Sequence, residues 1–184
     1  MLYLTNIRDR MRYILAYYCP LRNAVSCGII GIQKKFKKWG ETMQTYISHS
    51  EAETEKLGEQ FAKTLTGGTV VAMYGDLGAG KTAFVRGMAR GMGLTCRVSS
   101  PTFTIVNEYE GERELIHFDM YRLESADELF DIGWEDYLGR GAVCAVEWSE
   151  RVEDAFFGDE IVLRIDKLSD TDRKITIEEG KAKC

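Results

Sequence analysis

The amino-acid sequence predicts an α/β fold, a three-layer domain in which a mostly parallel central sheet lies between helices and carries antiparallel hairpins. Three observations support this prediction. Residues 69–74 and 142–146 are continuous apolar runs, which are typical of strands buried on both faces of a parallel sheet. Segments with the apolar spacing of a helix alternate with such runs. A glycine-rich segment, 75–82, joins the first of these strands to the helix that follows it.

The first helix is predicted over about residues 51–65. Ser50 and Glu53 have the spacing of a capping box, and apolar side chains recur behind them at helical intervals. The strand over residues 69–74 and a second helix over residues 83–92 follow. This succession of helix, strand and helix is what an α/β domain requires.

Two hairpins and a further helix complete the predicted elements. Short apolar or alternating runs that are separated by turn residues predict the hairpins. Ser125 is placed to cap a short helix between them. The strands of the two predicted hairpins cover residues 102–109, 113–118, 161–165 and 174–177.

The chain has 184 residues, with 24 Lys and Arg against 29 Asp and Glu, and a net charge of −5. This length suffices for one domain with a hydrophobic core. The acidic balance argues against a protein that holds nucleic acid by neutralising its phosphates, so we expect no DNA partner. The five cysteines include no C-x-x-C pair, which excludes a zinc ribbon or a thioredoxin-like motif and fits a reducing compartment.

The charge changes sign near residue 42. Residues 1–42 contain eight basic and two acidic side chains, a net charge of +6, which leaves −11 in residues 43–184. We therefore predict a P-loop-type domain over residues 43–184 and treat residues 1–42 as an N-terminal extension that is disordered or not native. A membrane anchor is excluded, because the uncharged stretches 13–21 and 23–33 fall short of the roughly 20 apolar residues of a spanning helix.

Three hypotheses for residues 1–42 stay open. A signal peptide would account for basic residues before an apolar stretch, but Pro20 interrupts its core. A basic arm over residues 34–39 would contact RNA or a protein partner. The leading hypothesis is a start codon assigned too early, with the true start at Met43, because the codons of residues 39–41 form a purine-rich string that resembles a bacterial ribosome-binding site. Peptides from residues 1–42 in a mass spectrum of the natural protein would contradict this hypothesis.

The strongest chemical signal is a phosphate-binding loop. Residues 75–82, Gly-Asp-Leu-Gly-Ala-Gly-Lys-Thr, match the pattern G-x-x-x-x-G-K-[ST] between a predicted strand and a predicted helix, which is the context that this motif requires. The glycines let backbone N–H groups surround an anion at the helix N-terminus. Lys81 is expected to reach the β- and γ-phosphates, and the Thr82 hydroxyl is expected to bind Mg²⁺. The sequence therefore predicts a nucleotide site.

Two acids follow predicted strands. Asp119 comes directly after residues 115–118, and Glu147 comes directly after residues 142–146. Because the carboxyl ends of parallel strands line the ligand crevice, Asp119 is a candidate Mg²⁺ ligand, and Glu147 is a candidate for orienting the attacking water or supporting the metal. A capping or turn role for Asp119 and a surface position for Glu147 are the structural alternatives. The hydroxyl-rich segment 99–104 offers a threonine that would sense the γ-phosphate, although such a segment is also typical of a turn.

The phosphate loop alone leaves the reaction open. No N-K-x-D motif is present, which argues against a Ras-type GTPase, and no arginine-rich lid of the kind found in small-molecule kinases stands out. A small-molecule kinase and a nucleotide-dependent regulatory module without significant hydrolysis remain alternatives. His49 and His117 are interpreted as a surface residue and a partly packed residue, because no set of side chains with metal-ligand spacing surrounds them.

Four sequence blocks together point to a family. Residues 75–82, 100–109, 117–123 and 147–150 resemble, in order and in sequence, the TsaE (YjeE) family of bacterial ATPases, which support threonylcarbamoyladenosine formation in tRNA. The resemblance covers about residues 43–177 and implies a P-loop NTPase-like fold. It implies a Mg-dependent ATPase that is weak alone and acts in the cytoplasm through a TsaB–TsaD complex. Contact with tRNA would be indirect, through that complex, and no membrane partner is implied.

The resemblance also assigns roles to residues. It implies catalytic roles for Lys81, Asp119 and Glu147, and these two acids together with Thr82 would hold Mg²⁺. The chain departs from the family at Ser149, where many members have proline, and we expect this difference to alter only the stiffness of the loop. The residues implied to bind ATP are Glu51, Gly78, Ala79, Gly80, Lys81, Thr82, Ala83, Thr102, Thr104 and Arg173.

Overall fold

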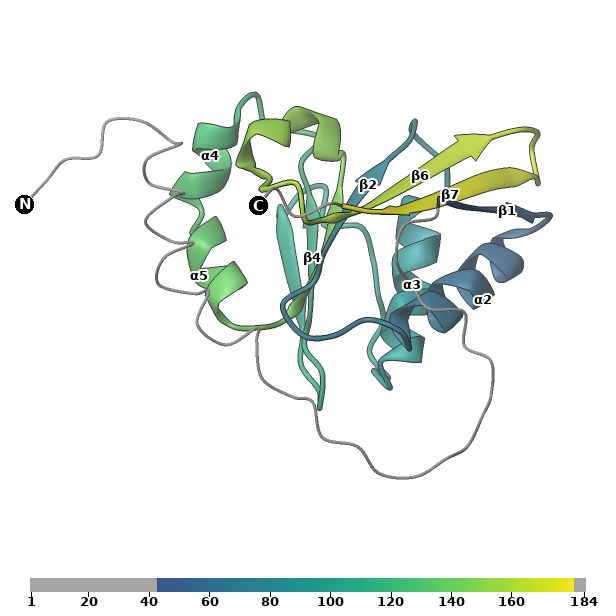
Figure 1. The fold of residues 1–184 in the computed structure, drawn as a ribbon, viewed down its shortest axis with the longest axis horizontal. Helices are drawn as coiled ribbons and strands as arrows, with labels where there is room; N and C mark the ends of the chain where they lie inside the picture. The colour runs from purple at the N-terminus through teal and green to yellow at the C-terminus, as the bar shows by residue number, and fades with distance from the viewer. Residues whose placement is uncertain (1–42, 181–184) are drawn as a thin grey trace, which may run out of the picture. The chain divides into compact units, whose positions relative to one another are not determined.

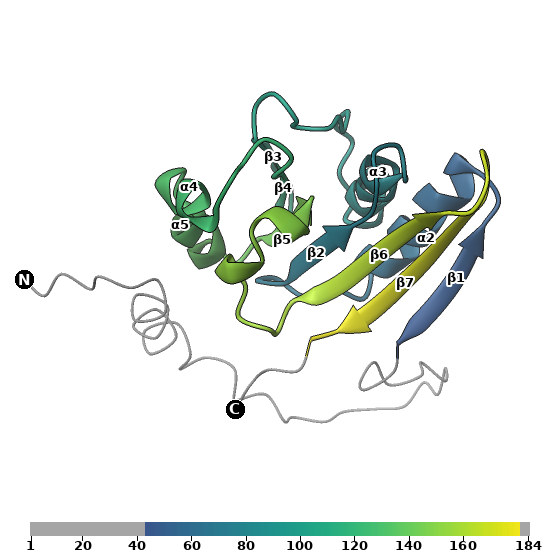
Figure 2. The ribbon, with the colours of Figure 1, turned by 90° about the horizontal axis from the view of Figure 1, so that it is seen from above.

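One mixed β-sheet carries helices on both of its faces (Figures 1 and 2). The computed structural model describes residues 43–180, and the strands of this range form a seven-stranded sheet in the order β1-β7-β6-β2-β5-β4-β3. The strands are β1 (Gln44–Ser48), β2 (Val70–Tyr74), β3 (Val106–Tyr109), β4 (Leu115–Asp119), β5 (Val143–Glu147), β6 (Ile161–Lys167) and β7 (Arg173–Glu179).

The four central strands run parallel to one another. β2 pairs in parallel with β5 on one side and with β6 on the other, and β5 pairs in parallel with β4. The outer strands are antiparallel, because β3 runs against β4, β7 runs against β6, and β1 runs against β7. The predicted fold class is therefore confirmed, with its mostly parallel centre and both antiparallel hairpins.

Two apolar clusters attach the helices to the two faces of the sheet. Side chains alternate along a strand, so Leu115 and Val143 join the cluster beneath α2 and α3, while Ile116 and Cys144 join the cluster beneath α4 and α5. Figure 1 shows these two helix pairs on opposite sides of β2 and β4. The helices are α2 (Glu51–Ala62), α3 (Lys81–Gly91), α4 (Ala126–Asp131) and α5 (Trp134–Gly139), and the short 3-10 helices are η1 (Ser149–Arg151) and η2 (Glu153–Ala155).

Helices α2 and α3 approach each other through glycines. A Cβ atom on Gly87 of α3 would lie 1.9 Å from the carbonyl oxygen of Glu55 in α2, and one on Gly58 of α2 would lie 2.2 Å from the carbonyl oxygen of Phe84. No side chain fits at such distances, so the two backbones are in direct contact. This contact holds α2 close beside the helix that starts at the phosphate loop.

The strand β3 is shorter than predicted. The prediction began at residue 102, but the backbone N–H groups of Thr104 and Ile105 donate to the Pro101 carbonyl at 3.0 and 2.6 Å, which closes a turn there. Ile105 has a positive φ of 67°, a conformation that β-branched residues rarely adopt. The strand therefore starts at Val106, and the hydroxyl-rich segment before it is a turn.

Other helix ends follow the predictions in part. The Ser50 side chain caps α2 by accepting from the Glu53 N–H at 3.2 Å, but the Glu53 carboxylate accepts from the His49 N–H at 2.7 Å, which is not the reciprocal bond of a capping box. Ser125 is the N-cap residue of α4, at the predicted position, but its side chain makes no capping hydrogen bond. Strand β1 and helix α5 lie outside the predicted elements.

Residues 1–42, which the three hypotheses concern, lie outside the described range. Residues 181–184, at the end of the predicted domain, also lie outside it. Within residues 43–180, no helix is long and apolar enough to cross a membrane.

Candidate functional site

A cavity of about 640 Å³ opens at the carboxyl ends of β2, β4 and β5. In open α/β sheets this edge is where ligands bind, and the volume falls within the range of small-molecule sites. The cavity brings together residues that lie far apart in the sequence. The predicted site residues that line it are Glu51, Gly78, Ala79, Gly80, Lys81, Thr82, Ala83, Thr102, Asp119, Glu147 and Arg173.

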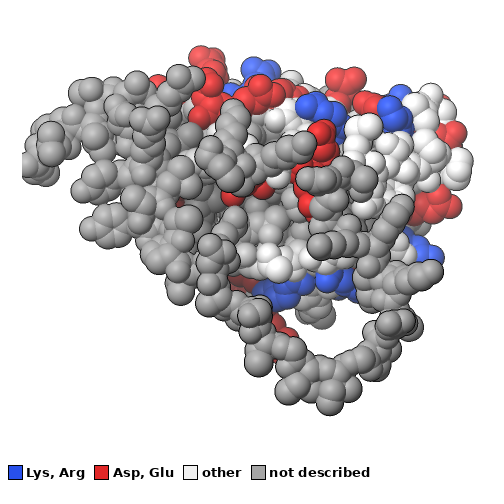
Figure 3. All heavy atoms as spheres, viewed as in Figure 1, with Lys and Arg blue, Asp and Glu red and all other residues white. Residues whose placement is uncertain are grey.

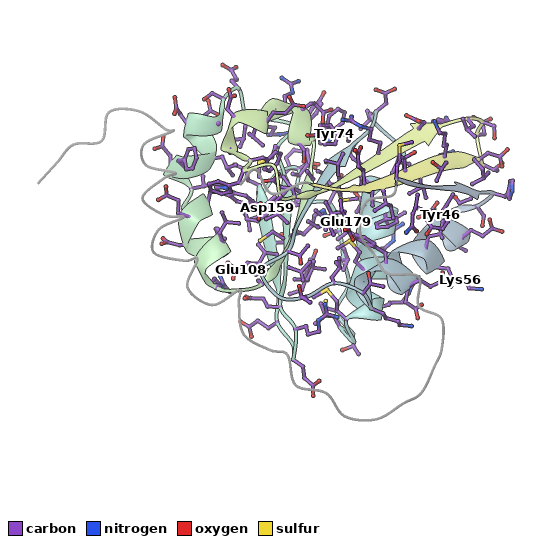
Figure 4. All side chains as sticks on the ribbon, in the orientation of Figure 1. Tyr46, Lys56, Tyr74, Glu108, Asp159 and Glu179 are labelled. Carbon is purple, nitrogen blue, oxygen red and sulfur yellow. The ribbon has the colours of Figure 1, made fainter. Side chains whose placement is uncertain are left out.

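The phosphate loop turns from β2 into α3. Strand β2 ends at Tyr74, whose position at the carboxyl end of the strand is labelled in Figure 4. Gly78 and Gly80 have φ values of 73° and 110°, in the left-handed region that glycine tolerates best. These two residues let the loop curl over the N-terminus of α3, which begins at Lys81. The first N–H groups of a helix lack intrahelical partners, so this end of α3 faces the cavity with backbone donors.

Lys81 is held inside the cavity by the loop itself. Its side chain is almost fully buried, and its ammonium donates to the carbonyl oxygens of Gly75 and of Asp76, the latter at 3.2 Å. The Nζ atom also lies 3.8 Å from the centroid of the Trp148 ring, a cation–π contact. Burial lowers the pKa of Lys81, and the nearby carboxylates, Glu147 first among them, oppose that shift. Within the described residues this buried ammonium donates to backbone carbonyls and forms no direct ion pair, so it is suited to an incoming polyanion.

The two strand-end acids lie side by side. Asp119 on β4 and Glu147 on β5 are paired in the register of these parallel strands, and both are buried. Glu147 Oε1 accepts a hydrogen bond from the Thr82 hydroxyl at 2.8 Å. The loop threonine and the acid of a distant strand are therefore in direct contact.

Asp119 holds the hydroxyl-rich turn. Its Oδ2 atom accepts from the Ser100 and Thr102 hydroxyls at 2.8 and 2.5 Å, and its Oδ1 atom accepts from the Tyr121 N–H at 3.0 Å. Thr104 lies apart from the cavity lining, where its hydroxyl donates to Asn107 at 3.0 Å. The structure therefore joins Thr102 to Asp119 of the acid pair and leaves Thr104 exposed, outside the cavity lining.

Arg173 ties the β6–β7 turn to the phosphate loop. Its Nε atom donates to the Ala79 carbonyl at 2.8 Å, and its Nη2 atom donates to the Gly78 carbonyl at 3.4 Å. Its Nη1 atom donates to the carbonyl oxygens of the turn that precedes β7. A direct contact of Arg173 with nucleotide stays a prediction, whereas its contact with the loop backbone is a feature of the protein chain alone.

An ion pair and a hydrogen bond lie on the α2 side of the site. Glu51, one of the residues implied to bind ATP, pairs with Arg86 of α3 at the edge of the cavity. His49, just before α2, lies 3.0 Å from Asp172 in the β6–β7 turn, and this hydrogen bond lowers the pKa of the Asp172 carboxyl. The β6–β7 turn thus contacts both the phosphate loop, through Arg173, and the residue before α2, through Asp172.

The structure adds features of two residues that the sequence analysis did not give. His117 is fully buried rather than partly packed as predicted, and its Nε2 atom lies 2.8 Å from Glu147 Oε1. The alternation of side chains along a strand could have indicated this position, because His117 precedes Asp119 by two residues and so points to the same face of β4. Trp148 has a positive φ of 60°, which is rare for a bulky residue and marks local backbone strain beside the acid pair. Nothing in the sequence pattern indicates that conformation.

Ser149 joins β2 to β5. Its buried hydroxyl accepts from the Met73 N–H at 3.0 Å and donates to the Val146 carbonyl at 2.8 Å. The expectation that this residue alters only loop stiffness is therefore wrong, because proline has no side-chain hydroxyl with which to make these bonds.

The Ser149→Ala variant is expected to lower the free energy of unfolding by about 1–3 kcal/mol, because it leaves the buried Met73 N–H without an acceptor. Urea denaturation followed by circular dichroism measures this change. Thr66→Ala, at an exposed position before β2, is the control and should change stability by less than about 0.5 kcal/mol. Equal stability of both variants would show that the Ser149 bonds contribute nothing.

Comparison with known proteins adds an independent result. The family model described as "Threonylcarbamoyl adenosine biosynthesis protein TsaE" matches residues 48–175. The tRNA threonylcarbamoyladenosine biosynthesis protein TsaE of Treponema pallidum is 38% identical over 131 residues, which cover 71% of this chain and 97% of that protein. The protein of the same name from Aquifex aeolicus is 39% identical over 140 residues, 74% of this chain and 97% of that protein.

A solved structure agrees with the sequence matches. The crystal structure of Bacillus subtilis YdiB superposes with a TM-score of 0.66 at 31% identity and covers 76% of this chain and 87% of that one. The family model spans the phosphate loop, both strand-end acids, Ser149 and Arg173. The cavity and its residues therefore lie within the matched region, and this chain belongs to the TsaE family.

Proposed function

We propose that the chain binds Mg-ATP in this cavity and hydrolyses it in support of threonylcarbamoyladenosine modification of tRNA, acting through a TsaB–TsaD complex in the cytoplasm. Membership of the TsaE family supports the role in tRNA modification. The ATPase proposal rests on one observation: Lys81 and Thr82 line the same cavity as the paired acids Asp119 and Glu147.

The residues that line the cavity fit a nucleoside triphosphate. The loop offers backbone N–H groups at the start of α3, and the buried Lys81 ammonium supplies a positive charge beside them. The cavity extends from the acid pair past the loop to Ser50 and Thr171, which leaves room for a nucleoside beyond the phosphates.

The oxygen ligands also fit Mg²⁺. This ion is usually held by one or two carboxylates together with substrate phosphates, and Thr82, Glu147 and Asp119 supply a hydroxyl and two carboxylates. Within residues 43–180 no group of three or more His, Cys, Asp or Glu side chains forms a dedicated metal cage. When bound, Mg²⁺ would neutralise the negative charge that develops on the β- and γ-phosphates.

Hydrolysis requires an activated water molecule. The water oxygen attacks the γ-phosphorus as the bond from that phosphorus to the β–γ bridging oxygen breaks, which yields ADP and inorganic phosphate. Glu147 is the group that orients this water and accepts its proton, because its Oε2 atom accepts no hydrogen bond from the described residues. Lys81 stabilises the charge on the phosphates.

Surface properties support a protein partner between this chain and tRNA. Leu77 and Phe103 are 82% and 83% exposed, and Tyr121 is 44% exposed, so apolar side chains lie on loops around the cavity. Residues 43–184 carry a net charge of −11, and acidic side chains lie among the basic ones on the face shown in Figure 3. An acidic surface does not favour direct contact with the phosphates of tRNA.

Phosphate release from Mg-ATP tests the proposal. The full chain would be assayed alone and with a TsaB–TsaD pair, beside the Lys81→Ala variant. We expect slow release alone, faster release with the pair, and at least about a 100-fold loss in the variant, because the phosphates lose their charged partner. A lack of response to an active TsaB–TsaD pair would contradict the family role. ATP consumption without free phosphate would instead favour a small-molecule kinase.

A further inference from the structure

Two hydrogen bonds converge on one oxygen of Glu147. The Thr82 hydroxyl and the His117 ring nitrogen Nε2 both lie 2.8 Å from Oε1. The other oxygen, Oε2, accepts no hydrogen bond from residues 43–180. A carboxylate held twice by the same oxygen has a fixed rotation, so its second oxygen points in one direction.

The chemistry of the His117 contact fixes the tautomer of its ring. An ionised carboxylate is only an acceptor, so Nε2 must carry the proton that lies between His117 and Glu147. The second ring nitrogen, Nδ1, is buried and has no hydrogen-bond partner among the described residues. The only hydrogen bond that the ring makes within the described residues is therefore the one to Glu147.

The sheet register explains how His117 reaches Glu147. His117 on β4 is paired with Ala145 on β5, and Glu147 follows two residues later on the same face of that strand. The small Ala145 side chain leaves space for the imidazole to cross toward Glu147. Tyr109 lies on β3, which flanks β4 on the side away from β5. The centroid of its ring is 6.5 Å from the centroid of the His117 ring.

We propose that His117 is a positioning residue for Glu147. Its Nε2–H bond holds Oε1 so that Oε2 faces the cavity, where the attacking water of ATP hydrolysis would bind. The bond uses no atom of Thr82, so it is available when the Thr82 hydroxyl turns to another ligand. The effect on hydrolysis rests on the proposed function, whereas the pairing of His117 with Glu147 does not.

Kinetic variants separate positioning from a merely structural role. His117→Leu removes the donor and should lower kcat for ATP by about 10- to 100-fold, the usual cost of losing a group that orients a catalytic ligand, with KM for ATP changed by less than about threefold. His117→Gln places an amide N–H near the position of Nε2 and should recover at least about one third of the lost rate. In a Glu147→Ala background, His117→Leu should cause no further loss of kcat. Equal losses in the Leu and Gln variants, or a full additional loss in the Glu147→Ala background, would overturn the proposal.

Nuclear magnetic resonance tests the pairing without any turnover. The chain has two histidines, so ¹⁵N-histidine labelling of the full protein yields two ring systems, and a His49→Gln variant assigns them. We expect the His117 ring to carry a slowly exchanging proton on Nε2, and we expect the resonance of this Nε2–H group to move in Glu147→Ala. A proton on Nδ1, or an unchanged resonance in that variant, would overturn the proposal even if His117→Leu does not fold. If the spectrum is as expected but the natural chain does not turn over ATP, the proposed function is refuted and the pairing of His117 with Glu147 still stands.

Discussion

The Glu147→Gln variant is expected to hydrolyse ATP about 1,000-fold more slowly than the natural chain in the presence of the TsaB–TsaD pair. Glutamine has nearly the same shape and keeps an oxygen that accepts from Thr82 and His117, so the packing of the site is preserved. It cannot accept a proton from the attacking water, and general-base catalysis is typically worth about 10²–10⁴-fold in rate. Its amide oxygen also stays available to Mg²⁺, and Asp119 keeps its carboxylate, so the affinity for Mg-ATP should change by less than about fivefold.

Phosphate release under saturating Mg-ATP and calorimetric titration with ATP measure the two quantities. Glu150→Gln is the matched control, because Glu150 lies three residues further along the same segment and is exposed. It should retain at least about half of the natural rate. Retention of that much activity by Glu147→Gln would remove Glu147 from catalysis and favour a regulatory module in which nucleotide binding alone matters.

The Gly87→Ala variant is expected to lower the free energy of unfolding by about 3 kcal/mol. An isolated helix would gain about 1 kcal/mol from this change, because alanine is the better helix former. Here the added Cβ would lie 1.9 Å from the Glu55 carbonyl oxygen, so α2 and α3 must move apart and lose packing along their contact. The tertiary contact therefore reverses the sign that helix propensity predicts.

Urea denaturation of the full chain measures this effect, with Lys56→Ala as the control. Lys56, labelled in Figure 4, extends from α2 into solvent, and its truncation should change stability by less than about 0.5 kcal/mol. ATP affinity should also fall in Gly87→Ala, because Thr54 of α2 and Ser50, the N-cap residue of α2, line the cavity. A Gly87→Ala variant as stable as the natural chain would show that the two helices separate at little cost.

The fold could be predicted from local pattern where the pattern was strong. The buried strands β2 and β5 are continuous apolar runs, and the phosphate loop has a motif with a known strand–helix context. Strand β1 was missed because its five residues, Gln-Thr-Tyr-Ile-Ser, are half polar and lie at a sheet edge. Helix α5 was missed because it has six residues and starts after Gly133, which offers no capping side chain.

The site was predictable in its residues and less so in its connections. Asp119 and Glu147 could be placed at strand ends because each follows an apolar run. That Glu147 contacts Thr82 depends on β5 lying directly beside β2, and sheet order is not encoded in any local segment. The His117 bond depends on the register of β4 against β5 in the same way. Glycine is a poor helix former, so helix propensity does not explain the glycines of α2 and α3, which let the two backbones touch.

The position of β7 has a consequence for how the protein is made. Of the described strands, β1 leaves the ribosome first and β7 leaves it last, and these two strands pair with each other. Ser48 therefore cannot pair with Arg173 until synthesis of the domain is nearly complete. Arg173 also supplies the hydrogen bonds that hold the backbone of Gly78 and Ala79. A nascent chain that ends before β7 therefore carries the whole phosphate-loop motif without the arginine that holds the loop. The proposed binding of ATP would stabilise the finished domain and give little help to its partly synthesised forms, which have to avoid aggregation without a ligand.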